Sequence, residues 1–346
     1  MKILSLNVRG FGVEGKFRWV KGLCSSEKPN VVVLQETKVH YIDEGWVQSL
    51  WGGNNCGFVQ IEAEGNSGGL LTIWDSSSFV ANSAVGNRYF IAFRGTWLGS
   101  GVESAIVNIY GPHNDKCKIE MWGALDNLLS SVDSAWVLCG DFNEVRSHSE
   151  RLNCVFNQSR ASRFNDFIER NSLVEIPING KRFTRISDDG TKFSKLDRFL
   201  VNDNFIKQWD DLSVVAIDRR ESDHCPIILR DKAIDFGPKP FKIFDEWFSK
   251  DGIDKIISDA WEKDVRGYRK DCRFRDKLKN VKLELKEWSK SEFGGIDNEI
   301  NAVKDEVSKW ESKAESGSLS DNDRERWLDT RRKWIAKEKS KANMLR

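Results

Sequence analysis

Short apolar runs alternate with helical patterns over the first 230 residues, and this alternation limits the fold class. The runs are four to eight residues long and are separated by clusters of Gly, Asn, Asp and Ser, as is typical of strands. Between them, apolar residues three or four positions apart predict helices over Lys16–Cys24, Lys116–Leu129 and Arg160–Arg170. We expect an α/β fold in which mixed β-sheets pack together with helices outside. The predicted strands include Ile3–Val8, Val31–Leu34, Gly69–Trp74, Phe90–Phe93, Ser104–Tyr110, Trp136–Cys139, Asp197–Val201 and Cys225–Leu229.

The sequence changes character after a Phe-Gly-Pro-Lys-Pro segment at residues 236–240, which neither a helix nor a central strand can continue. Beyond it, apolar residues recur at helical spacing in a charge-dense background, with expected breaks at Gly294-Gly295 and at residues 316–318. Ser320 is a suitable N-cap for the last helix. We therefore predict a catalytic domain over residues 1–232, a linker over 233–240 and a helical hairpin or coiled-coil region over 241–346. Such helices also offer a surface for self-association.

Composition excludes several classes of protein. The chain has 54 Lys and Arg against 53 Asp and Glu, which excludes a uniformly basic, histone-like binder but not a local basic groove. No apolar run approaches the roughly 20 residues that span a bilayer, and the N-terminus is too polar for a signal peptide. The seven cysteines are scattered without a C-x-x-C pair, which argues against a disulfide framework or a zinc site and favours an intracellular protein.

Oxygen-bearing side chains stand at the ends of several predicted strands. Strand ends hold side chains rigidly, so these groups can converge on one edge of a sandwich. Burying unpaired carboxylates together costs several kcal/mol each, and a hard divalent cation relieves their repulsion. Oxygen ligands select Mg²⁺ or Mn²⁺ over zinc, and with a His they make a phosphate-cleaving centre that needs no covalent nucleophile. The residues concerned are Asn7, Glu36, Asp141, Asn143, Asp197, Asp223 and His224.

Six short motifs in a fixed order resemble the endonuclease/exonuclease/phosphatase family, and their spacing is similar to that of its apurinic/apyrimidinic-endonuclease branch. They are Leu6-Asn7, Gln35-Glu36-Thr37, Asn108-Ile109-Tyr110-Gly111-Pro112, Gly140-Asp141-Phe142-Asn143, Leu196-Asp197-Arg198 and Ser222-Asp223-His224-Cys225-Pro226. Within that branch the chain resembles the endonuclease domain of plant LINE-type (non-LTR) retrotransposons. The residues that carry this second resemblance are Leu6-Asn7-Val8-Arg9-Gly10-Phe11-Gly12, Arg182-Phe183-Thr184 and the Phe-Lys-Ile-Phe-Asp-Glu-Trp segment at residues 241–247.

The resemblance implies a four-layered α/β sandwich and phosphodiester hydrolysis that depends on Mg²⁺, with Mn²⁺ as a substitute. It further implies nicking of chromosomal DNA to prime reverse transcription. DNA is then the expected partner, RNA or a reverse transcriptase are further ones, and the nucleus is the expected location.

The same resemblance implies a role for each residue at the metal and at the attacking water. Glu36 is the expected principal metal ligand, assisted by Asn7, and Asp223 is expected to support a second metal position. Asp141 would orient and deprotonate the water. Asn143 would fix the carboxylate of Asp141 and hold the scissile phosphate.

The resemblance implies roles at the phosphate for three more residues, of which Asp197 acts through His224. His224 would donate to a non-bridging phosphate oxygen, where negative charge builds in the transition state. Asp197 would hold the ring of His224 and raise its pKa. Tyr110 would hydrogen-bond the phosphate. The expected substrate-facing groups are thus Asn7, Tyr110, Asn143 and His224.

Two positions depart from the family pattern. Arg9 stands where abasic-site endonucleases carry an acid, which argues against a role in abasic-site repair. Arg185 stands where a Trp is usual, at the surface expected to face DNA. Taken singly, each site residue also has a structural explanation: Asp197, for example, could pair with Arg198 or Arg185.

Two other functions remain open on the sequence. One is a phosphatase or phosphodiesterase acting on phosphoinositides, sphingomyelin or nucleotides. The other is an inactive or domesticated fragment that binds nucleic acid or a partner through its helices. A full retrotransposon protein would continue into a reverse transcriptase, so we expect a truncated element without the polymerase domain.

Overall fold

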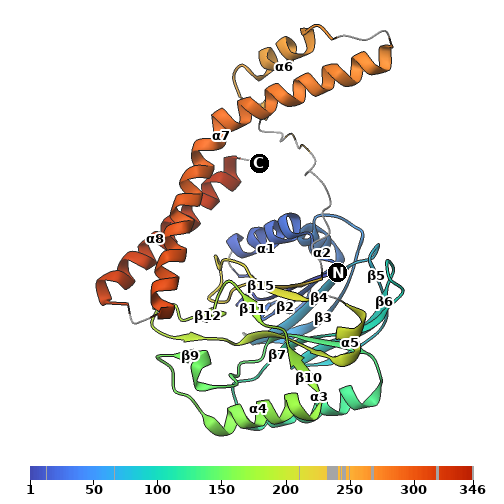
Figure 1. Ribbon diagram of the computed structural model, residues 1–346, viewed down its shortest axis with the longest axis vertical. Coiled ribbons are helices and arrows are strands. Elements are labelled where there is room, and N and C mark those ends of the chain that lie inside the picture. Colours follow the sequence, from blue (N-terminus) through green and yellow to red (C-terminus); the bar gives the residue numbers. More distant parts are fainter. Residues whose placement is uncertain are drawn as a thin grey trace. The chain divides into compact units, whose positions relative to one another are not determined.

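The structure is a computed structural model that describes residues 1–344 apart from 13, 66, 210, 232–240, 242, 244–246, 249, 266–268 and 317–318. The chain forms two compact units, residues 1–233 and residues 234–346 (Figure 1). The expected linker, residues 233–240, lies outside the described residues. Each unit is considered by itself below.

The first unit contains a seven-stranded mixed sheet in the order β11-β15-β16-β1-β2-β4-β3. β1 pairs with β2 in parallel, and β1 pairs with β16 antiparallel on its other side. The parallel pair is joined through helix α1 (Glu14–Glu27). The strands are β1 (Lys2–Asn7), β2 (Val31–Gln35), β3 (Cys56–Glu64), β4 (Ser67–Asp75), β11 (Ile178–Asn179), β15 (Ser213–Ala216) and β16 (Ile227–Arg230).

A six-stranded mixed sheet has the order β10-β14-β8-β7-β6-β5. Its parallel pair, β7 and β8, is joined through α3 (Asp115–Ser131), as β1 and β2 are joined through α1. The strands are β5 (Phe79–Asn87), β6 (Phe90–Trp97), β7 (Glu103–Tyr110), β8 (Ala135–Asp141), β10 (Leu173–Glu175) and β14 (Asp197–Asn202). A small third sheet consists of β9 (Arg151–Leu152), β12 (Arg185–Ile186) and β13 (Phe193–Ser194).

The apolar core is divided into three layers by the strand period of two. Ile3 of β1 faces the core between the sheets with Val137 of β8, whereas Leu4 faces α1 and α2 (Glu44–Trp51). Leu138 of β8 faces the opposite way, into a core with α3 and α4 (Gln158–Arg170). Each fully buried side chain of this kind stabilises the fold by about 1.5–3 kcal/mol. Figure 1 shows the resulting helix–sheet–sheet–helix layers, which confirm the four-layered sandwich.

The long strands β3 and β5 fall outside the apolar runs named above, and both lie at sheet edges. Most of β5 is exposed, and its segment from Asn82 to Asn87 contains only two apolar side chains larger than Gly. β3 closes the other sheet and has one buried residue, Ala63. An edge strand buries little on either face, so it lacks the apolar signal on which sequence-based prediction depends. Helix α5 (Asp203–Gln208) follows β14.

The second unit contains α6 (Ile253–Glu262), α7 (Lys270–Ser316) and α8 (Asp321–Met344). The expected break at Gly294-Gly295 is wrong, because α7 runs through both glycines. Each glycine weakens a helix by about 1 kcal/mol, but the apolar residues on either side, such as Leu285 and Ile300, are buried and hold the helix together. Among the described helices, none combines the length and the apolar character that crossing a membrane requires.

α7 and α8 form an antiparallel hairpin. Asp323 near the start of α8 pairs with Lys313, while Lys337 near its end pairs with Glu299, so residue numbers rise along one helix as they fall along the other. Ser320 caps α8 as its sequence indicates, since its Oγ accepts a hydrogen bond from the N–H of Asp323 at 3.2 Å. Trp327 and Trp334 of α8 are buried.

Candidate active site

Strand register brings two acidic residues together. Asp197 opens β14 and lies directly opposite Asp141, which ends the neighbouring strand β8. His224, which precedes β16 in the other sheet, completes the group: its Nδ1 lies 2.8 Å from Asp197 Oδ2, and its Nε2 lies 3.8 Å from Asp141 Oδ2. Atoms of the three side chains lie within 4.8 Å of one another, and all three are buried. The two sheets therefore share one polar site.

Asn7 joins this group to Glu36. The amide nitrogen of Asn7 donates to Glu36 Oε1 at 3.0 Å and to Asp141 Oδ2 at 2.8 Å. Its amide oxygen accepts the backbone N–H of Arg9 at 2.9 Å, so that oxygen is directed away from the two carboxylates. Asn7 thus holds Glu36 and Asp141 side by side as a hydrogen-bond donor, and its expected part as a metal ligand stays a prediction.

Two of the site residues have left-handed backbone conformations. Glu36 has φ +50° immediately after β2, and Asn143 has φ +49° two residues after β8. This conformation costs a residue with a side chain roughly 1–2 kcal/mol, and such strain concentrates at functional sites. At Glu36 it is held by a hydrogen bond from the N–H of Gly10 to the Glu36 carbonyl oxygen.

The surroundings of the site residues shift their pKa values in different directions. Burial alone would lower the pKa of His224, but the carboxylates of Asp197 and Asp141 outweigh it and raise that pKa to about 9. Burial raises the pKa of Asp141 to about 6, against the opposing effect of the His224 charge. At neutral pH His224 is therefore an imidazolium and Asp141 is mostly ionised. Burial would raise the pKa of Glu36, but hydrogen bonds from Asn7 and Tyr110 outweigh it and leave that pKa below its ordinary value.

Asn143 and Tyr110 contact the carboxylates in different ways. The backbone N–H of Asn143, not its side chain, donates to Asp141 Oδ1 at 2.9 Å. The side-chain amide of Asn143 instead donates to the carbonyl oxygen of Gly111 at 2.8 Å. The Tyr110 hydroxyl hydrogen-bonds Glu36, and burial together with that carboxylate raises the pKa of Tyr110 far above its usual range. Tyr110 is therefore a neutral donor.

Asp223 has a different environment from the one expected for it. Its side chain is 2% exposed, its Oδ2 accepts a hydrogen bond from Arg185 Nε at 3.1 Å, and Arg9 Nη1 lies 3.6 Å away. Its Oδ1 is buried without a hydrogen-bond partner among the described residues, and the second metal position expected at Asp223 stays a prediction. Arg185 is thus the partner of Asp223, while Asp197 is hydrogen-bonded to His224 rather than to either arginine considered for it.

Several buried polar residues position the site, and sequence reasoning did not assign them. Gln35, next to Glu36, donates to Asn108 Oδ1 at 2.7 Å across the core between the sheets. Ser222 Oγ donates to the carbonyl oxygen of Asn7 at 2.8 Å and accepts the N–H of His224. Thr184 Oγ1 accepts the N–H of Asp197 at 3.0 Å. In the sequence, the one sign of such a role is that a polar residue stands within a family motif, at a position where an ordinary core residue would be apolar.

The donor set suits a hard divalent cation. Glu36 is half-buried and Asp141 is buried, and the amide nitrogen of Asn7 donates to both carboxylates. Asp197 Oδ1 is buried without a hydrogen-bond partner among the described residues. Ligands made of oxygen alone are those that Mg²⁺ and Mn²⁺ prefer. His224 carries a proton and is already hydrogen-bonded to Asp197, so it is unsuited as a ligand. The residues that could hold a cation are therefore the carboxylates.

Several solved structures have a similar fold. The AP endonuclease LMAP from Leishmania major is 18% identical with a TM-score of 0.52, over 66% of this chain and 86% of that one. The 3′-5′ exonuclease NExo from Neisseria meningitidis is 18% identical with a TM-score of 0.54, over 67% and 99%. The endonuclease domain of TRAS1, a telomere-specific non-LTR retrotransposon, is 13% identical with a TM-score of 0.51, over 66% and 96%. At these identities the likeness concerns the fold.

Sequence comparison gives the family directly. Comparison with curated proteins yields no match. The model of the Endonuclease/Exonuclease/phosphatase family matches residues 4–224, which include every site residue predicted above. Enzymes of this family hydrolyse phosphoester and phosphodiester bonds. Because the matched segment spans more than half of the chain, this protein belongs to the Endonuclease/Exonuclease/phosphatase family.

Proposed function

We propose that this protein is a Mg²⁺-dependent DNA endonuclease of retrotransposon origin. The observation that carries the proposal is the group formed by Asp141, Asp197 and His224, with Asn7 linking Asp141 to Glu36. It contains a base, an oriented imidazolium and a carboxylate pair for a cation, which together are sufficient for hydrolysis of a phosphodiester by water. The neighbours named as AP endonucleases and as a retrotransposon endonuclease domain support DNA as the substrate.

In the proposed reaction Asp141 takes the proton of the attacking water. Hydrogen bonds from Asn7 and from the Asn143 N–H fix both oxygens of its carboxylate, so the base does not have to reorient. A bound Mg²⁺, held by Glu36 and Asp141, would supply Lewis-acid neutralisation of the phosphate charge. Tyr110, a neutral hydroxyl beside Glu36, would donate to a phosphate oxygen.

His224 would stabilise the transition state. Its Nδ1 is hydrogen-bonded to Asp197, which fixes the plane of the ring. Its Nε2 lies 3.8 Å from Asp141, too far for a hydrogen bond, so the Nε2 proton is available to a phosphate oxygen of the substrate. Removing one such donor costs about 3–4 kcal/mol, or roughly 100- to 1,000-fold in rate.

The finer parts of the proposal rest on the sequence motifs. The resemblance to plant LINE endonucleases supports nicking of chromosomal DNA to prime reverse transcription, and with it a nuclear location. We assign this activity to residues 1–232 and treat residues 241–346, beyond the linker, as a separate helical region. That region would self-associate or contact RNA or a reverse transcriptase.

Supercoiled plasmid provides the test. We expect nicking with Mg²⁺ or Mn²⁺ and none with EDTA, and a loss of 100- to 1,000-fold for Asp141→Asn and for His224→Gln. His148→Gln, which alters a histidine outside the site, is the matched control and should nick like the wild type. Glu36→Gln should shift the Mg²⁺ dependence to higher concentrations. Wild-type rates for both Asp141→Asn and His224→Gln would refute the assigned roles.

The same protein samples also test the two other functions that the sequence leaves open. Release of phosphate from phosphoinositides, sphingomyelin or nucleotides without plasmid nicking would indicate a small-molecule phosphatase. Salt-dependent DNA binding without cleavage at any Mg²⁺ concentration would indicate an inactive fragment that binds nucleic acid.

A further inference from the structure

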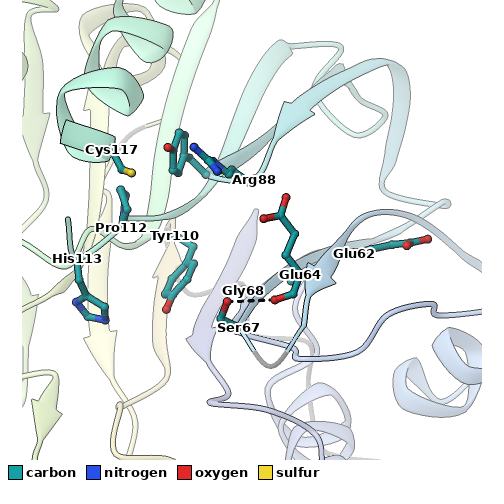
Figure 2. A pocket seen from close by; sticks show the side chains of 11 residues that line it. Glu62, Glu64, Ser67, Gly68, Arg88, Tyr110, Pro112, His113 and Cys117 are labelled. Carbon is teal, nitrogen blue, oxygen red and sulfur yellow. Dashed lines mark hydrogen bonds between the residues drawn. The ribbon is translucent and has the colours of Figure 1, made fainter. Parts of the chain in front are cut away.

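A pocket of about 280 Å³ opens beside the candidate site, close to the lower end of the roughly 300–1,000 Å³ found for small-ligand pockets. It lies between the β3–β4 hairpin, the turn between β5 and β6, and the segment that leads from β7 into α3. Figure 2 shows Tyr110 and His113 on one wall and the hairpin residues Glu64, Ser67 and Gly68 on the other.

Tyr110 connects the pocket to the site. Its ring lines the pocket, while its hydroxyl is hydrogen-bonded to Glu36. The pocket therefore begins one side chain away from the carboxylate pair. A nucleic acid strand with its cleaved phosphate at His224 would have an adjacent nucleoside close to this opening.

The lining of the pocket includes aromatic side chains. Tyr89 is 8% exposed, and the guanidinium of Arg88 stacks over its ring at 4.9 Å. Pro112 and the exposed ring of His113 continue this lining next to Tyr110. Planar heterocycles stack on such surfaces, and bases of any sequence do so because each has a π-face.

Charge favours a nucleobase over a phosphate in this pocket. Glu62 and Glu64 lie on the hairpin side, and Figure 2 shows Glu64 extending toward Arg88 while Glu62 extends away from it. The one arginine of the lining, Arg88, already forms an ion pair with Glu120 at 3.7 Å. A second phosphate would meet net negative charge, whereas a carboxylate accepts hydrogen bonds from the exocyclic amine of a base.

We propose that this pocket binds an amine-bearing nucleobase (cytosine, adenine or guanine) from a nucleotide adjacent to the cleaved phosphodiester, and so sets the base preference of nicking. Within a duplex that base must leave the stack to enter the pocket. The inference rests on the proposed endonuclease function for its substrate, but apart from Tyr110 it concerns residues that take no part in the hydrolysis.

Mapping of nick positions at nucleotide resolution tests the proposal. We expect the wild type to prefer one of the amine-bearing bases at a fixed position beside the nick. Cys117→Phe, which fills the pocket, should remove that preference while nicking continues, and Arg88→Ala should reduce it. Tyr89→Ala should lower the ratio of preferred to non-preferred nicking about tenfold, the usual scale of base–aromatic stacking.

Matched controls exist for two of these changes. Cys56→Phe enlarges another partly buried cysteine outside the pocket. Arg170→Ala removes an arginine that is 58% exposed and paired with Asp126, comparable to Arg88, which is 55% exposed. Both controls should keep the wild-type preference. An unchanged preference in Cys117→Phe, or a wild type without base preference, would overturn the proposal.

Photocrosslinking gives a readout that does not require cleavage. Duplexes carrying 5-iodocytosine would be irradiated with the Asp141→Asn variant and Mg²⁺, and the crosslinked peptides identified by mass spectrometry. Crosslinks to Tyr89 or Tyr110 support the pocket even if the wild type fails to nick, an outcome that would count against the proposed function alone. Crosslinks found only elsewhere in the protein would overturn the pocket even if nicking occurs.

Discussion

Replacing Asp197 by Asn keeps the size of the side chain but removes the charge that holds a proton on His224. The pKa of His224 is about 9, against an ordinary value of 6.5. At about 1.4 kcal/mol per pKa unit, this difference corresponds to about 3 kcal/mol of preference for the protonated form. Burial opposes the charge on His224 while Asp141 still favours it, so we expect its pKa in Asp197→Asn to fall well below 9, toward its ordinary value.

The same shift has a signature in stability. A histidine whose pKa is raised by folding stabilises the native state below its unfolded pKa, and that stabilisation is lost as the pH rises through the folded pKa. For the wild type the free energy of unfolding should therefore fall by about 3 kcal/mol between pH 6.5 and about 9. Asp197→Asn should lack most of this fall.

Ring NMR of the four histidines, in EDTA, measures the pKa directly, and urea denaturation at a series of pH values measures the stability. Replacement of His40, His113 and His148 by Gln in turn would assign the signals. Asp188→Asn removes an exposed carboxylate near Arg9 and is the matched control, with no expected change at His224. A wild-type midpoint at or below 6.5, or the same midpoint in the wild type and Asp197→Asn, would refute the reasoning.

Two other predictions concern charged residues around the site. Burial would raise the pKa of Glu175, but Arg198 and Lys195 outweigh it and lower that pKa from 4.5 to about 2. The ionised Glu175 should therefore add about 3 kcal/mol to the free energy of unfolding above pH 4.5, and this stabilisation should be lost as the pH falls toward 2. Urea denaturation of the wild type and Glu175→Gln should converge over that range, and parallel curves would contradict the pairing. If the guanidinium of Arg185 contacts a DNA phosphate, Arg185→Ala should make the plot of log DNA affinity against log salt concentration less steep by about one unit of slope. Fluorescence anisotropy measures this affinity. Arg170→Ala serves as control, and equal slopes for the two variants would exclude that contact.

Much of the fold was predictable from the sequence because its central strands are buried on both faces. Such strands appear as continuous apolar runs, and Val31–Gln35 of β2 is the simplest case, with every residue buried. Edge strands gave no comparable signal. The break expected at Gly294-Gly295 was wrong because helix propensity is a weak local preference, and packing on either side of the glycines outweighed it.

The site was predictable as a set of residues but not as a set of contacts. Strand ends identified Asn7, Glu36 and Asp141, but only the register of β8 and β14 places Asp197 opposite Asp141. Which partner each polar group takes depends on three-dimensional neighbours that are far apart in sequence, and so the arginine pair around Asp223 could not be foreseen.

Lys118 illustrates why some charged residues are misread. It lies on a predicted helix and would ordinarily face solvent, yet it is 3% exposed and donates to Glu144 and to the carbonyl oxygen of Asn143. Breaking such a buried pair costs about 3–5 kcal/mol because the remaining charge is left without compensation. Nothing in the helical spacing distinguishes a lysine with this role from a solvated one.

The division of the site between the two sheets has a consequence for biosynthesis. Asn7, Glu36 and His224 belong to the seven-stranded sheet or its flanks, while Asp141 and Asp197 belong to the six-stranded one. A nascent chain, a folding intermediate or a proteolytic product that retains a single sheet has only half of the chemistry. Under the proposed function, the capacity to cut a chromosome would arise in one step, when the two halves dock, and would vanish at the first step of degradation.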